Sequence, residues 1–476
     1  MNKYKTLAGN TALISIGTFG SKLLVFLMVR FYTSYLTPSD YGTADLITQT
    51  ANLLFPLISL GITDGVFRFA LDHPKSRRSI FTAGTVTIAC GSLLFLIVVP
   101  LLHLVKEFSG YLWLIVLYTL TESYHTLCAQ FIRAIGKTAL YAGQGVLNTM
   151  LVIGLNILLL VVFHLGLTGY VLSVALADLL CTAYLFIREK LWRQLTPHPR
   201  ASAFRQMLRY SIPLIPTTVL WWITAVSDRY MVNGFIGSEA NGIYAVSYKV
   251  PTIITIVSGI FMSAWQFSAI SEAQGDRQEH IRFFERVWRI FQAGMMLICS
   301  LMIAFARLEI RVLADASYFE AWKYVPVLAA AMLFASFATF LGSVYMVTRR
   351  SDLSLTTALL GASLNVGLNL LMIPSFLGIQ GAAIATLACY VVVFVVRAVS
   401  VRRFIPFRLH VGRLSVSAAL IAVQVITMVL SVPGWQYVQA SCFCLLALLH
   451  SGPLYGMLDR GLQSLRDLLR RRRPAE

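Results

Sequence analysis

The sequence predicts an all-α membrane protein with about fourteen transmembrane helices. The composition, the long apolar runs and the positions of the basic residues between those runs support this prediction. Hydrophobic residues make up 57% of the 476 residues and charged residues only 13%, whereas a soluble domain carries about 25% charged residues. A chain this apolar has too few polar groups to cover a water-exposed surface, but a lipid-facing surface needs few of them.

The apolar runs have the length of transmembrane helices. A spanning helix needs about 20 mostly apolar residues to cross roughly 30 Å of hydrocarbon. The runs are continuously apolar, whereas the strands of a membrane barrel alternate over about ten residues. The predicted spans are 8–30, 42–64, 80–104, 111–133, 140–163, 168–187, 210–235, 243–268, 288–306, 324–347, 353–374, 380–400, 411–432 and 436–457.

The basic residues give these helices an orientation. Lysine and arginine accumulate in cytoplasmic loops, and most of the 39 fall in cytoplasmic segments if the N-terminus is cytoplasmic. The net charge of +18 lies in short clusters between apolar runs, which argues against a continuous nucleic-acid surface. We therefore expect a multi-pass protein with both termini in the cytoplasm.

The sequence predicts no metal site and no cofactor. All seven cysteines lie in apolar stretches, without a CxxC pair or a His-Cys cluster of metal spacing. The chain contains no GxxxxGK[ST] loop, no DxD motif in a loop and no serine elbow. We therefore expect neither an enzyme nor transport powered by ATP through this chain alone.

The two halves of the chain resemble each other at an offset of about 200 to 213 residues. The matched segments are Gly154–Leu158 with Gly367–Leu371, Gly166–Gly169 with Gly378–Gly381, and Arg30–Gly42 with Arg229–Gly242. Six helices in each half make the repeat parallel, an arrangement that in transporters places the substrate site between the halves. The predicted domains are six-helix bundles at 1–200 and 201–403, an additional transmembrane helix pair at 404–457, and a basic amphipathic cytoplasmic tail at 458–476.

Ionisable residues inside the predicted spans are the candidates for a functional site. A charge at the bilayer centre costs about 2.5–3.5 kcal/mol on insertion scales, so it usually faces a cavity or a partner. The basic candidates, expected to attract a phosphate or pyrophosphate group, are Lys22, Arg30, Arg229 and Lys249. The candidates for charge balance or for binding a coupling cation are Asp45, Glu122, His125, Asp178 and Asp228.

Simpler interpretations of four candidates stay open. Arg30 can extend to the outer interface. Asp228 and Arg229 can form a local structural pair, and His125 can be a packed, hydrogen-bonded histidine.

Three stretches resemble bacterial polysaccharide flippases. DRYMVNGFIGSEANGIYAVSYKV from Asp228 is similar to their seventh-to-eighth helix region, VRFYTSYLTPSDYGTADL from Val29 to their helix 1–2 junction, and YFEAWKYVPVL from Tyr318 to the segment before helix 10. The resemblance covers essentially the whole chain. It implies membership of the polysaccharide branch of the multidrug/oligosaccharidyl-lipid/polysaccharide exporter superfamily.

The resemblance implies two six-helix bundles in a V shape around a cationic cavity, in the inner membrane of a bacterium. It implies alternating access that moves undecaprenyl-pyrophosphate-linked repeat units of O-antigen, capsule or another surface glycan to the outer leaflet. The implied partners are that lipid-linked glycan, membrane lipids, and a glycan polymerase and glycosyltransferases of the same pathway. No nucleic acid is implied, and we expect a monomer.

Two other functions stay open. In a multidrug or cation antiporter of the same fold, acidic cavity residues should outnumber basic ones. A membrane glycan polymerase or ligase should carry a sizeable external loop with catalytic Arg or His, whereas the longest external loop predicted here is 307–323.

Overall fold

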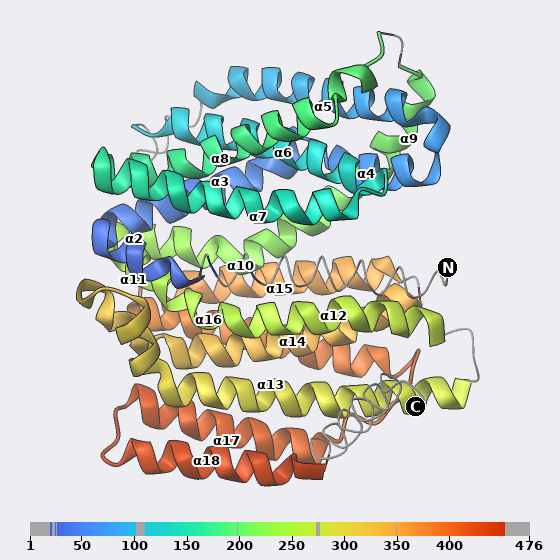
Figure 1. Cartoon of the computed structure of the whole chain (residues 1–476). Coiled ribbons are helices and arrows are strands. Elements are labelled where there is room, and N and C mark those ends of the chain that lie inside the picture. The colour runs from blue at the N-terminus through green and yellow to red at the C-terminus, as the bar shows by residue number, and fades with distance from the viewer. Residues whose placement is uncertain are drawn as a thin grey trace, which may run out of the picture. The chain divides into compact units, whose positions relative to one another are not determined.

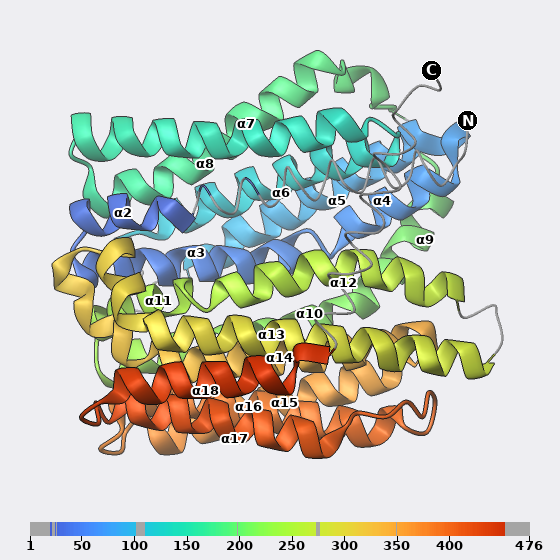
Figure 2. The same ribbon diagram turned by 60° about the horizontal axis from the view of Figure 1, so that its bottom comes forward.

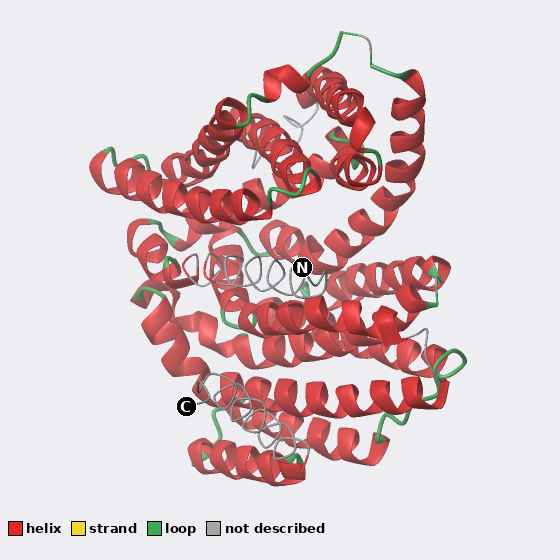
Figure 3. Ribbon diagram, turned by 45° about the vertical axis from the view of Figure 1, so that its right-hand side comes forward, coloured by secondary structure: helices red, strands yellow, loops and turns green. Residues whose placement is uncertain are grey.

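The computed structural model describes residues 20, 24, 26–100, 110–197, 199–272, 277–348 and 350–452. Across these residues the regular structure is helical and contains no β-strand (Figure 3). The predicted tail 458–476, most of the first predicted span 8–30 and the candidate Lys22 lie outside the described residues.

In the described residues, helices overlap every predicted span from 42–64 to 436–457, and the spans 42–64 and 243–268 are each divided between two helices. In the described part of the chain, seven helices are long and apolar enough to cross a membrane, and two bent helix pairs qualify if each counts as one span. The prediction of an all-α membrane protein is therefore confirmed, whereas the number of fourteen spans stays a prediction. The bent pairs are Pro38–Ile58 with Ile62–Asp72, at 52°, and Ser238–Lys249 with Thr252–Ser263, at 42°.

The chain forms two compact units. The first consists of Met1–Val246, Val312–Tyr318 and Asn369–Gly378, and the second of Ser247–Arg311, Phe319–Leu368 and Ile379–Glu476. The predicted domain boundaries at 200/201, 403/404 and 457/458 stay predictions.

The first unit carries most of the candidate residues. Its helices, labelled in Figure 1, are α2 (Val29–Tyr35), α3 (Pro38–Ile58), α4 (Ile62–Asp72), α5 (Arg77–Val98), α6 (Leu112–Ala134), α7 (Thr138–Asn156), α8 (Gly166–Arg188), α9 (Ala201–Ser211), α10 (Ile215–Phe235) and α11 (Ser238–Lys249) as far as Val246. Helix α7 continues into a π-helical turn, Ile157–Val162.

Helix α3 begins at a hydrogen-bonded N-terminal cap. The Thr37 hydroxyl oxygen accepts the backbone N–H of Asp40 at 3.2 Å, and the hydroxyl donates to Asp40 Oδ2 at 2.7 Å. Pro38 occupies the first helical position, where the missing N–H costs nothing. At the other end, Gly61 takes a φ of 62°, which glycine adopts without steric cost, and the chain bends into α4. The cap fixes the register of α3 and so the direction of Asp45.

Two hydrophobic clusters pack the first unit. One joins α4, α5, α6, α8 and α9, with the rings of Phe81 and Phe131 at 4.6 Å between centroids. The other joins α3, α6 and α8 through fully buried side chains such as Ile47, Ile115 and Val171. Helices α6 and α8, which carry Glu122, His125 and Asp178, thus pack directly against each other.

The second unit is organised around aromatic side chains. Its helices are α12 (Thr252–Glu272), α13 (Arg277–Leu313) as far as Arg311, α14 (Val325–Val347), α15 (Ser351–Met372) as far as Leu368, α16 (Gly378–Val401) from Ile379, α17 (Val411–Val429) and α18 (Trp435–Leu449). The Trp265 ring stacks on Phe340 at 5.2 Å, and its indole N–H donates to Ser343 Oγ at 2.9 Å.

Helices α17 and α18 correspond to the predicted additional helix pair. They lie side by side in both views of the ribbon (Figures 1 and 2). Gln424 and Gln439 join them, because each side-chain amide donates to the backbone oxygen of the other residue, at 3.3 and 2.9 Å. Hydrogen bonds from side-chain amides commonly join helices in a membrane.

Candidate functional site

The four basic candidates occupy different surroundings. Lys22 is outside the described residues, and Lys249 is half-buried at the end of α11, in the second unit. Arg30 and Arg229 belong to the first unit, where the former is exposed and the latter is only 8% exposed. The shared cationic cavity stays a prediction, and Arg229 is the member whose chemistry can be described in detail.

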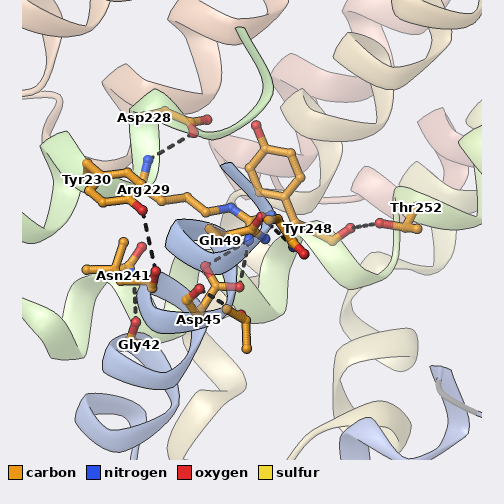
Figure 4. Close-up of polar contacts among 12 residues, drawn as sticks. Gly42, Asp45, Gln49, Asp228, Arg229, Tyr230, Asn241, Tyr248 and Thr252 are labelled. Atoms are coloured by element: carbon orange, nitrogen blue, oxygen red, sulfur yellow. Dashed lines mark hydrogen bonds and ion pairs between the residues drawn. The ribbon is translucent and has the colours of Figure 1, made fainter. Parts of the chain in front are cut away.

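Arg229 forms a buried ion pair with Asp45. Its Nη1 lies 2.6 Å from Asp45 Oδ1 and 2.8 Å from Oδ2 (Figure 4). Arg229 is on α10 and Asp45 is in the second turn of α3. The sequence placed Asp45 among the charge-balancing residues, and the structure brings it to this arginine.

Asp228 serves the backbone and a tyrosine. Its Oδ1 accepts the backbone N–H of Arg229 at 2.9 Å, and its Oδ2 accepts the Tyr244 hydroxyl at 2.8 Å. Asp228 is fully buried. The pairing of Asp228 with Arg229 is therefore local, through the main chain, and the two carboxylates have separate tasks.

Polar side chains also fasten α3 to α10 next to the ion pair. The hydroxyls of Tyr230 and Thr50 are 2.6 Å apart, and the Trp222 indole N–H donates to the backbone oxygen of Gln49 at 3.1 Å. Both contacts lie within two turns of Asp45 on α3. They fix the spacing of the two helices and so hold the carboxylate within reach of the guanidinium.

Helices α3 and α11 cross at two glycines. A Cβ on Gly42 would lie 2.7 Å from the backbone nitrogen of Gly242, and a Cβ on Gly242 would lie 2.7 Å from the carbonyl carbon of Pro38. Asn241 donates to the Gly42 carbonyl at 2.8 Å (Figure 4), and the hydroxyls of Ser39 and Ser238 are 2.6 Å apart. Only glycine admits such a close approach of two backbones.

Arg30 contacts the segment Val312–Tyr318 of the same unit. Its guanidinium donates to the Ala314 carbonyl and lies 4.0 Å from Asp315 Oδ2. The Thr33 hydroxyl oxygen accepts the backbone N–H of Asp315 at 3.0 Å. The Arg30 side chain is 50% exposed, which is compatible with the interfacial interpretation of this residue.

His125 and Asp178, predicted as separate candidates, form one cluster. His125 Nδ1 lies 2.9 Å from Asp178 Oδ1, and Asn148 Nδ2 donates to the same oxygen at 2.7 Å. The other ring nitrogen, Nε2, lies 2.7 Å from Gln144 Oε1. Glu122 stands one turn before His125 on α6, and its Oε2 is buried without a hydrogen-bond partner in the described structure.

The sequence reasoning missed three polar residues. Gln144 and Asn148 complete the His125 cluster, and their signal was two amides one turn apart within an apolar span. Arg397, which falls within the predicted span 380–400, was not among the candidates, but it lies inside α16 and is 3% exposed. Its guanidinium donates to Thr357 Oγ1 at 3.1 and 2.9 Å and to the Ala338 carbonyl at 2.7 Å.

These two clusters offer charged groups that can bind an anion or a proton. Within the described residues no group of three or more His, Cys, Asp or Glu could hold a metal ion. In the Arg229–Asp45 pair, another anion can replace the carboxylate as the hydrogen-bond acceptor of the guanidinium. The His125 cluster offers a titratable ring between two acceptors.

Solved structures similar to the chain are membrane transporters. The lipid II flippase MurJ, in an inward closed conformation, aligns with a TM-score of 0.70 at 14% identity, over 94% of this chain and 99% of that chain. An inward-facing multidrug resistance MATE family transporter of the MOP superfamily aligns with a TM-score of 0.65 at 12% identity, over 80% of this chain and 95% of that one. An outward-facing MATE structure aligns with a TM-score of 0.61 at 13% identity, over 83% and 95%.

No curated relative matches the chain. The family described as "Polysaccharide biosynthesis protein" matches residues 7–274, more than half of the chain. That segment includes Asp45, Arg229 and the whole His125 cluster. Together with the fold shared with MOP-superfamily transporters, the match establishes that the chain belongs to the polysaccharide biosynthesis protein family.

Proposed function

We propose that the chain flips undecaprenyl-pyrophosphate-linked oligosaccharide repeat units from the cytoplasmic to the outer leaflet of a bacterial inner membrane. The head group moves by alternating access while the lipid tail stays in the bilayer. Both termini are cytoplasmic, and the chain works as a monomer. The units feed a glycan polymerase and come from glycosyltransferases of the same pathway, for O-antigen, capsule or a related surface glycan.

Family membership and fold coverage support a lipid-linked substrate. The family is defined by polysaccharide biosynthesis. The lipid II flippase aligns with 94% of the chain, whereas the MATE exporters named above align with 80% and 83%. The larger alignment fits a chain that carries an additional helix pair, α17 and α18, beyond the two predicted six-helix bundles.

The observation that carries the proposal is the buried Arg229–Asp45 pair. A guanidinium binds phosphate oxygens through two parallel N–H donors, as it binds a carboxylate. A pyrophosphate can therefore replace Asp45 as the partner of Arg229, and the displaced Asp45 carboxylate then pairs with the coupling cation for which it is a candidate. In this proposal Asp45 holds the arginine ready when no substrate is bound, and Lys22, Arg30 and Lys249 add to the attraction.

The membrane potential favours the proposed direction of movement. With the inside negative, each negative charge moved outward across 100 mV gains about 2.3 kcal/mol. A pyrophosphate with two uncompensated charges gains roughly twice as much, and protein charges that move with it reduce the gain.

The test replaces the gene in its source bacterium with variants and measures surface glycan and the amount of inserted protein. Arg229→Gln is expected to abolish the glycan. Because the buried Asp45 carboxylate is then left alone, it is also expected to lower stability by about 3–5 kcal/mol. The double variant Asp45→Asn, Arg229→Gln removes both charges, and is expected to regain stability but not glycan.

The matched control is Arg350→Gln, which removes an exposed arginine paired with Asp352 at 2.8 Å. It is expected to leave the glycan unchanged. Normal glycan in the inserted double variant would contradict the role of Arg229. The proposed substrate would be contradicted if the genes next to the gene of this chain encoded a pathway that makes no lipid-linked glycan.

A multidrug or cation antiporter is the second candidate, and the buried His125–Asp178 cluster favours it. The two candidates differ in a simple assay. Cells that overproduce an antiporter should survive higher concentrations of cationic dyes, whereas cells that overproduce the proposed flippase should not.

A further inference from the structure

The environment of the His125 ring defines its protonation. Asp178 Oδ1 already accepts the Asn148 amide and lies 2.9 Å from Nδ1, and an ionised carboxylate can only accept. The Nδ1 atom must therefore carry a hydrogen. On the other side, Nε2 lies 2.7 Å from Gln144 Oε1, also an acceptor, so this contact requires a hydrogen on Nε2 as well.

A second arrangement exists for the neutral ring. If Nε2 loses its proton it becomes an acceptor, and the Gln144 amide turns by half a rotation to present its NH₂ group. The Nδ1–H donor stays with Asp178 in both arrangements. The cluster is thus a two-state element in which one proton, on Nε2, decides which way the Gln144 side chain on α7 faces.

We propose that this cluster, made of His125, Asp178, Gln144 and Asn148, is the proton-binding site that couples proton movement to flipping. The coupling to flipping rests on the proposed function, whereas the existence of the proton site does not. A proton binds at His125 Nε2 from one side of the membrane and leaves from the other side. No covalent bond other than N–H forms or breaks.

The electrostatics supply a reason for coupling. When the proton is bound, the charges of the His125 imidazolium and the Asp178 carboxylate cancel. When it is absent, the His125–Asp178 pair carries one net negative charge. The Asp178 and His125 side chains are only 9% and 14% exposed, so an uncompensated charge there is costly. The empty site therefore favours a conformation that admits water between α6, α7 and α8, and the loaded site favours the packing described above.

The remaining titratable groups that act on the cluster come from two helices. Helix α6 contributes Tyr118 and Glu122, and α8 contributes Cys181 besides Asp178. Glu122 is the group whose charge state matters most, because its Oε2 is buried without a hydrogen bond in the described structure. A carboxylic acid satisfies that position better than a carboxylate.

The direct test observes the ring. Histidine labelled with ¹⁵N in the protein, reconstituted in phosphatidylethanolamine–phosphatidylglycerol liposomes, gives nitrogen shifts that separate imidazolium from each neutral tautomer. His125→Gln identifies the His125 signals by their loss. We expect both nitrogens of His125 to be protonated at the acidic end of the range from about pH 5 to pH 8, and only Nδ1 to be protonated at the basic end.

Two further variants make this test specific. Asp178→Asn is expected to abolish the preference for the Nδ1–H tautomer, and Gln144→Leu is expected to alter the Nε2 signal. The matched control is the exposed His73 at the end of α4, whose signals should not respond to either variant. A His125 ring that keeps one protonation state over the whole range, in liposomes that contain folded protein, overturns the proton site.

The coupling is tested separately in cells. Nigericin removes the pH gradient and valinomycin the potential. Nigericin is expected to reduce surface glycan severalfold in the wild type but not to change the small remainder in His125→Gln. Glycan that is equally sensitive to nigericin in both proteins overturns the coupling. If the wild type makes no glycan under any condition, the proposed function fails, while the nitrogen shifts still decide whether the proton site exists.

Discussion

The crossing of α3 and α11 allows a quantitative prediction for Gly42→Ala. The new Cβ would clash with the Ser238 carbonyl oxygen and would lie 2.7 Å from the Gly242 nitrogen, both backbone atoms that cannot rotate away. Ordinary contacts begin at 3.4 Å, so the two helices must separate by at least about 0.7 Å. That movement stretches the Asn241 hydrogen bond to the Gly42 carbonyl, which is 2.8 Å long in the native protein.

The free-energy cost of the clash in Gly42→Ala exceeds the gain from the helix propensity of alanine. Forcing a methyl group into a packed contact costs typically about 1–3 kcal/mol, and a weakened hydrogen bond adds about 0.5–1.5 kcal/mol. Alanine recovers roughly 0.5–1 kcal/mol through its greater helix propensity. We therefore expect a net loss of about 1–3 kcal/mol of stability.

The assay is the temperature at which half of the detergent-solubilised protein is lost from the monodisperse peak in fluorescence-detected size exclusion. Gly42→Ala should lower that temperature by several degrees. The matched control is Gly154→Ala on α7, where an added Cβ has no atom within 4 Å and should leave stability unchanged or slightly raised. If Gly42→Ala and Gly154→Ala behave alike, the close backbone approach does not contribute as argued.

Two further substitutions test buried contacts by the same thermal assay. Gly342→Ala places a Cβ 2.6 Å from Arg397 Nη1. Because three hydrogen bonds hold that guanidinium, we expect a loss of about 1–3 kcal/mol; unchanged stability would mean that the arginine can move aside freely. Tyr244→Phe removes the hydroxyl that donates to the fully buried Asp228, and we expect a loss of about 1.5–3 kcal/mol; a loss below 0.5 kcal/mol would show that the carboxylate finds another donor.

The helices were predictable because their signal is local. An apolar run of about 20 residues has one stable solution in a bilayer, the helix, since every backbone group must be bonded within the segment. The 52° bend between α3 and α4 was not predicted, although Gly61 with its positive φ marks it. A single glycine is too common a residue for its conformation to be inferred without neighbours.

The candidate site was only half predictable for a related reason. The cost of a charge in the membrane identifies Asp45, Arg229, His125 and Asp178 as residues that need partners. It does not say which partners, because Asp45 and Arg229 are 184 positions apart in the sequence and meet only through helix packing. The amide of Gln144 carries no charge, so the cost of a buried charge did not identify it, although it decides how the histidine ring is bonded.

The predicted internal repeat accounts for the meeting of two matched glycines. The predicted match of Gly42 with Gly242 also pairs Pro38 with Ser238, which lie four positions earlier. A Cβ on Gly42 would meet the backbone of Ser238, and a Cβ on Gly242 would meet the backbone of Pro38. The matching backbone conformations of two other paired glycines, Gly166 at φ 52° and Gly378 at φ 50°, follow the same pattern.

Gly242→Ala is therefore expected to lower stability by about as much as Gly42→Ala, because the two clashes are reciprocal. One separation of α3 from α11 relieves both, so the double variant should lose clearly less than the sum of the single losses. Strictly additive losses would mean that the two contacts are independent. In that case the crossing would not be the symmetric element that the repeat implies.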